Sequence, residues 1–167
     1  MKVKEPYMTT ANRFRIEERG PAQVSIIGVI DEYADLTVLP GMAQRGALQV
    51  DLAGVTFINS LGVRDWIRLQ AAAKAARVQL ELINVAEPII HQLNMIIATR
   101  GTATVTSFFA PYACDACGRE DSLIIDAVAH AASLQRGQAP AMVCSECGSA
   151  MAFNDFPERY LAFLQAE

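Results

Sequence analysis

The sequence contains no unbroken run of 18 apolar residues, so no transmembrane helix is expected. Its first residues also lack the apolar stretch of a secretory signal, and the prediction is a cytoplasmic protein. Apolar residues nevertheless make up 52% of the 167 residues, which is enough to fill a folded core. This length favours one domain with an appendage, or two small domains.

Motifs that carry catalytic chemistry are also missing. The sequence has no Gly-rich phosphate loop, and no motif supports a Ser–His or Cys–His pair. We therefore expect a protein that is not an enzyme.

Basic residues are few in the last third of the chain. Residues 1–111 hold eleven Lys and Arg against ten Asp and Glu, a net charge of +1, whereas residues 112–167 hold three against eight, a net charge of −5. Nucleic-acid binding draws most of its affinity from contacts of Lys and Arg with phosphates. An acidic region of this kind makes nucleic-acid binding the less favoured of the candidate functions.

Cysteine is absent from the first 113 residues, and all four cysteines lie in two C-x-x-C pairs. The pairs are Cys114 with Cys117 and Cys144 with Cys147, and a glycine follows each pair. A tetrahedral zinc ion takes four thiolates, and each pair can supply two of them from one turn. Glycine suits the positive φ angle that such a turn commonly needs. The spacing predicts a structural zinc site of the zinc-ribbon class in residues 111–167.

Three alternatives compete with the zinc interpretation of the cysteines. Disulfides would need an oxidising compartment, of which the sequence gives no sign. A thioredoxin-like redox pair would be a single C-x-x-C that opens a helix. Iron is the remaining alternative, because four thiolates suit iron as well as zinc. A catalytic zinc usually has three protein ligands and an open position, so four thiolates favour a structural role.

Hydrophobic periodicity in the first 110 residues predicts strands that alternate with helices. The expected strands are residues 13–19, 23–30, 47–52, 78–83 and 102–109, and the expected helices are residues 32–39, 63–76 and 87–97. This order predicts an α/β (α+β) fold, with a mixed β-sheet covered by helices. Trp66 shares the apolar stripe of the long helix, so it is expected in the core.

Two segments resemble a known family. Gly28-Val29-Ile30-Asp31-Glu32 and the stretch from Val50 to Val63 are similar to the STAS domain, the fold of bacterial anti-sigma-factor antagonists and of sulfate-transporter tails. The resemblance covers residues 13–110. It implies an N-terminal tail (1–12), a STAS-like domain (13–110) and a zinc-ribbon domain with a C-terminal helix (111–167).

The resemblance also implies a partner-binding turn. In the antagonists this turn typically reads Asp-Ser-Ser/Thr-Gly, and a kinase phosphorylates the second hydroxyl residue. Here Asn59, Ser60, Leu61 and Gly62 occupy these positions, with Asp31 near them, so leucine stands at the phosphoacceptor position. Either Ser60 is a displaced acceptor, or the turn binds its partner without a phosphoswitch. We favour the second, because leucine has no hydroxyl.

The polar turn residues have a simpler interpretation beside the functional one. Asn59 and Ser60 are good N-caps for the helix that follows, and Asp31 could cap a short helix after its strand. The last segment of the chain, around Tyr160 and Phe163, predicts an apolar helix that packs on the ribbon, on the sheet or on a second subunit.

The sequence thus predicts a non-catalytic signalling or scaffold protein. It would bind a protein partner (a regulatory kinase, an anti-sigma factor or a scaffold) through the turn and the long helix. A homodimer held by the ribbon is a further expectation, and a nucleic-acid-binding zinc-ribbon regulator is the alternative.

Overall fold

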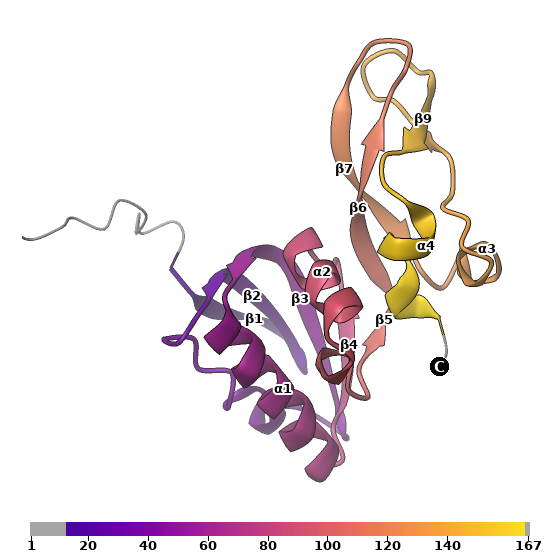
Figure 1. Cartoon of the computed structure of the whole chain (residues 1–167). Coiled ribbons are helices and arrows are strands. Elements are labelled where there is room, and N and C mark those ends of the chain that lie inside the picture. Colours follow the sequence, from indigo (N-terminus) through magenta and orange to yellow (C-terminus); the bar gives the residue numbers. More distant parts are fainter. Residues whose placement is uncertain (1–12, 166–167) are drawn as a thin grey trace, which may run out of the picture.

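A computed structural model describes residues 13–165, and the predicted N-terminal tail (1–12) lies outside this range. The described chain forms two β-sheets that stand next to each other (Figure 1). The first has the strand order β1-β2-β3-β4-β5, and the second has the order β7-β6-β9-β8. The strands are β1 (Arg15–Gly20), β2 (Gln23–Ile30), β3 (Ala47–Ile58), β4 (Gln79–Ile83), β5 (Thr104–Val105), β6 (Ser107–Ala113), β7 (Glu120–Asp126), β8 (Met142–Val143) and β9 (Ala150–Phe153).

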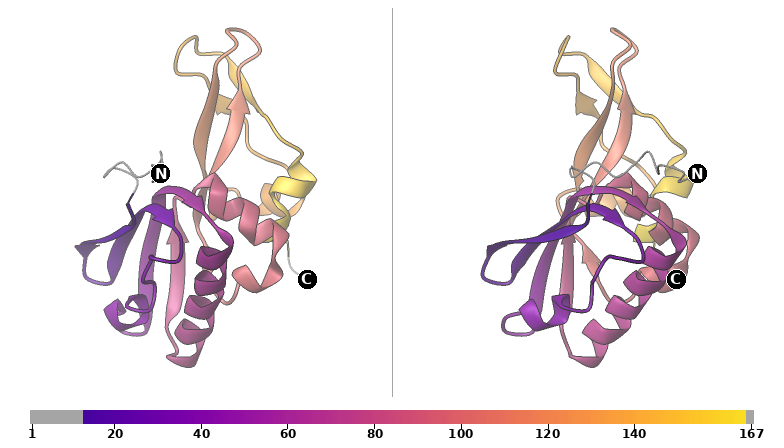
Figure 2. Two further views of the ribbon diagram at one scale, coloured as in Figure 1. Left: turned by 60° about the vertical axis from the view of Figure 1, so that its left-hand side comes forward. Right: turned by 90° about the vertical axis from the view of Figure 1, so that its left-hand side faces the viewer.

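Two helices cover one face of the first sheet (Figures 1 and 2). They are α1 (Ser60–Ala75) and α2 (Glu87–Met95). Strand β1 is antiparallel to β2, whereas β2, β3, β4 and β5 run parallel, so each parallel pair needs a crossover connection. Trp66 on α1 is 1% exposed and donates its indole N–H to the Thr99 carbonyl at 2.9 Å. The mixed sheet with its helices confirms the predicted fold class, and the core position of Trp66 is confirmed as well.

The short helix expected at residues 32–39 does not form. The chain makes turns there, followed by a 3₁₀ helix, η2 (Leu39–Met42). The side chains of two aspartates explain the difference, because each accepts a hydrogen bond from the backbone N–H two residues further on. Asp31 accepts from Tyr33 and Asp35 accepts from Thr37, both at 3.0 Å. Such local bonds favour turns over a helix.

The single strand expected at residues 102–109 is two strands in two different sheets. Thr106 lies between β5 and β6 and is bonded to both sheets. Its N–H donates to the Leu82 carbonyl in the first sheet at 3.0 Å, and its carbonyl accepts from Ala127 beside the second sheet at 2.9 Å. We call residues 13–105 the first lobe and residues 107–165 the second lobe. The predicted domain boundary at residues 110/111 falls inside β6.

The C-terminal segment joins the two lobes. It forms two short helical turns, α4 (Pro157–Tyr160) and η4 (Ala162–Leu164), rather than one continuous helix, and α3 (Ala131–Gln135) precedes β8. Asn94 on α2 donates to the Tyr160 carbonyl and accepts from the Phe163 N–H, both at 2.8 Å. The Tyr160 hydroxyl donates to the Phe109 carbonyl at 2.7 Å. This end of the second lobe therefore packs on α2 of the first lobe and on β6 of its own lobe.

Between residues 13 and 165, none of the helices is long and apolar enough to cross a membrane.

Candidate metal centre and partner-binding turn

The two C-x-x-C pairs form two turns with the same backbone hydrogen bonds. In the first, the Cys114 N–H donates to Arg119 and the Gly118 N–H donates to Cys114, both at 2.8 Å. In the second, the Cys144 N–H donates to Ser149 at 2.8 Å and the Gly148 N–H donates to Cys144 at 2.9 Å. The φ angles of the two glycines are +75° and +73°, which confirms the predicted positive φ after each pair.

The turns bring the four predicted ligand atoms together. All four Sγ atoms lie within 4.8 Å of one another. Two sulfur contacts run between the turns, 3.5 Å from Cys114 to Cys147 and 3.6 Å from Cys117 to Cys144. A tetrahedral ion with metal–sulfur bonds of about 2.3 Å needs sulfur atoms about 3.8 Å apart. The cluster fits such an ion, and the sulfur atoms are too far apart for the roughly 2.0 Å bond of a disulfide.

The first cysteine of each pair is buried and the second is exposed. Hydrogen bonds from Ser149 lower the pKa of Cys147 to about 6, and the bond from the serine side chain has a larger effect than the bond from its backbone N–H. At Cys117 the backbone N–H of Arg119 lowers the pKa, but hydrogen bonding with the Cys114 and Cys144 thiols raises it to about 12. Four thiolates within 4.8 Å of one another would repel, and a bound cation would offset their charge.

An arginine links the two turns outside the sulfur cluster. The Arg119 guanidinium donates to Glu146 in the second turn at 2.7 Å and to Asp121 on β7 at 2.8 and 3.1 Å. These charge-assisted bonds fix the turns relative to each other. The role of Arg119 could not be recognised from the sequence, because Glu146 lies 27 residues away.

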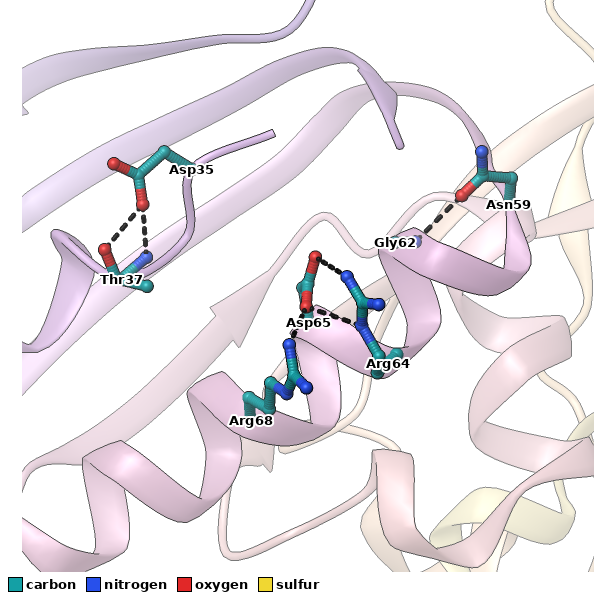
Figure 3. Close-up of polar contacts among 7 residues, drawn as sticks. All are labelled: Asp35, Thr37, Asn59, Gly62, Arg64, Asp65 and Arg68. Carbon is teal, nitrogen blue, oxygen red and sulfur yellow. Dashed lines mark hydrogen bonds and ion pairs between the residues drawn. The ribbon is translucent and has the colours of Figure 1, made fainter. Parts of the chain in front are cut away.

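The predicted partner-binding turn lies where β3 meets α1. Asn59 is the N-cap of α1, as expected, and its Oδ1 accepts from the Gly62 N–H at 2.8 Å (Figure 3). Its side-chain N–H donates to Glu32 at 3.0 Å, and its backbone N–H donates to the Ile30 carbonyl at 3.1 Å. Asn59 therefore connects the turn after β3 to the turn after β2.

The other predicted turn residues have different surroundings. Ser60 is exposed, Leu61 is 40% exposed, and Gly62 is buried against the Ile30 carbonyl. The carboxylate of Asp31 accepts a hydrogen bond from the Tyr33 N–H within its own turn. The acidic residue that contacts Asn59 is instead Glu32. No role for Glu32 was predicted from the sequence. One signal was available: Glu32 follows β2 and Asn59 follows β3, and parallel neighbouring strands end at the same edge of a sheet.

Charged side chains follow the turn along the exposed face of α1 (Figure 3). Asp65 accepts from Arg64 at 3.0 and 3.1 Å and from Arg68 at 3.0 Å. The hydrogen bond from Arg64 is the main cause of a lowered pKa for Asp65. The first three turns of the helix thus present two guanidinium groups to solvent, and Arg64 lies one turn from Leu61.

No family model, curated protein or solved structure matches this chain.

Proposed function

We propose that this chain is a non-catalytic protein-interaction module of the STAS type, in which a structural zinc ion stabilises the second lobe. The four clustered sulfur atoms support the zinc part of the proposal. Four thiolates complete the coordination of zinc and leave no open position for substrate, as in structural sites. Iron fits the same sulfur geometry, so metal analysis distinguishes the two.

The partner-binding part is supported by three exposed apolar side chains at the ends of β2 and β3. Tyr33 is 77% exposed, Phe57 is 56% exposed and Leu61 is 40% exposed. Each lies within two residues of Asn59 or Glu32 in the sequence, and these two side chains are hydrogen-bonded to each other. Exposed aromatic and aliphatic side chains near arginines are typical of protein-binding surfaces. A protein partner is therefore favoured, and the turn binds it without a phosphate on residue 61.

Leu61→Glu is expected to weaken partner binding by about 10-fold or more, because it places a charge at an exposed apolar position of the proposed surface. Quantitative affinity purification from the native host would measure the loss, with purified partner and calorimetry as the second step. Val143→Glu is the matched control, since Val143 is 73% exposed but lies on β8 in the second lobe.

Equal recovery of the same partner by the wild-type chain and by Leu61→Glu would contradict the proposed surface. Stoichiometric phosphate on Ser60 in the native host would instead contradict binding without a phosphoswitch. Intact-mass measurement of the purified chain detects that phosphate directly.

A further inference from the structure

Strand β7 (Glu120–Asp126) is an edge strand of the second sheet, and it is unusually regular. All seven of its residues pair with β6 in one unbroken antiparallel register. The β6–β7 hairpin also projects beyond the first sheet (Figure 2). A regular free edge can accept another strand, and proteins usually prevent this with a lysine, a proline or a bulge. Residues 122–125, Ser-Leu-Ile-Ile, contain none of these features.

The hydrogen bonds around β7 show which of its backbone groups face outward. The Cys114 N–H donates to the Arg119 carbonyl, and the Ala127 N–H donates to the Thr106 carbonyl. In this register the N–H and C=O groups of the odd-numbered residues of β7 point toward β6. The even-numbered residues therefore direct their N–H and C=O groups to the free edge. Within residues 13–165, no hydrogen bond engages the N–H or C=O of Ile124, the N–H of Asp126 or the C=O of Ser122.

The side chains of β7 favour a second copy of the same strand as the partner. When an antiparallel copy is centred on Ile124, the two Ile124 side chains face each other, Leu123 faces Ile125, and Ser122 faces Asp126. Ile124 is 47% exposed and pairs with half-buried Phe109 on β6, so this register adds to an apolar surface. A register centred on Leu123 would instead set Glu120 against Asp126, which is unfavourable.

We propose that two copies of this chain pair through antiparallel β7 strands, with the two-fold axis at Ile124. The pairing joins the two second sheets into one continuous sheet of eight strands. Four hydrogen bonds would connect the two β7 strands, and none of them displaces an existing bond. Two join the Ile124 residues to each other, and two run from Asp126 N–H groups to Ser122 carbonyls. The symmetry is isologous, as in most homodimers. The contact is small, so the dimer is expected to be weak and its fraction to rise with protein concentration.

Ile124→Pro tests the proposal without disturbing the pairing of β7 with β6. Proline removes only the outward N–H of residue 124, and proline is tolerated at such edge positions. In sedimentation equilibrium, the wild-type chain is expected to approach twice its 18.1 kDa mass as its concentration rises, whereas Ile124→Pro stays at one chain mass. Unchanged metal content and melting temperature would show that the variant is folded.

Ile124→Cys provides a second test that does not depend on tolerance of proline. In the proposed register the two residues form a hydrogen-bonded pair with Cα atoms about 5.5 Å apart, a distance that suits a disulfide. Mild oxidation is expected to cross-link Ile124→Cys and to leave the exposed control Val143→Cys uncross-linked. A wild-type chain that stays monomeric, a dimer that persists in Ile124→Pro, or equal cross-linking of the control would overturn the proposal.

Discussion

Replacing Cys144 with serine is expected to abolish metal binding and to unfold the second lobe, with a smaller effect on strands β1 to β4. Cys144 is 1% exposed and supplies one of the four sulfur atoms. Structural zinc contributes about 10–16 kcal/mol of apparent binding free energy in small modules, which is comparable to the whole stability of a typical domain. The strands around the second turn are short, since β8 has two residues and β9 has four. Few hydrogen bonds would remain to hold them.

Hydrogen exchange followed by mass spectrometry measures this effect for each strand. The amides of β6 to β9 should lose protection in Cys144→Ser, whereas those of β2, β3 and α1 should keep most of theirs. Ser145→Ala is the matched control, because Ser145 is exposed in the same turn and supplies no sulfur. Full protection of β6 to β9 in Cys144→Ser would show that the cysteines do not stabilise this lobe.

The second large effect is expected for Gly62→Ala. A Cβ atom on residue 62 would lie 2.1 Å from the carbonyl oxygen of Ile30 and 2.7 Å from its carbonyl carbon. Neither atom can move alone, because the Ile30 carbonyl accepts a hydrogen bond from the Asn59 N–H and ends a buried strand. Separating α1 from β2 to make room would cost about 3 kcal/mol or more of unfolding free energy. Urea denaturation followed by the fluorescence of Trp66, the sole tryptophan, measures the loss.

Gly41→Ala is the control for this substitution. Its Cβ would meet nothing within 4 Å, and its backbone φ is not positive. The same chemical change should therefore alter stability by about 1 kcal/mol or less there. A Gly62→Ala chain as stable as the Gly41→Ala chain would refute the close contact between α1 and β2.

The parts of the fold that depend on local patterns could be predicted from the sequence. The long helix is predictable because Val63, Trp66 and Gln70 follow helical spacing, and Asn59 is a favourable N-cap. The two cysteine turns are predictable because each contains its own spacing and glycine. Neither feature needs information about a distant part of the chain.

The features that the sequence did not predict depend on hydrogen bonds between distant segments, or on side chains that compete with the helix for nearby backbone N–H groups. The split at Thr106 arises because its N–H and its carbonyl bond to different sheets, which no local pattern indicates. The contact of Glu32 with Asn59 spans 27 residues. At residues 32–39 the apolar spacing allowed a helix, but the side chains of Asp31 and Asp35 bond nearby N–H groups and favour turns.

The most direct test of the proposed structural zinc site is native mass spectrometry of the full chain, purified without added metal. The four-thiolate cluster predicts one zinc ion per 18.1 kDa chain, and a chelator that removes it should also expose β6 to β9 to hydrogen exchange. Iron in place of zinc, or a metal-free chain in which these strands are fully protected, would contradict the proposed structural zinc site.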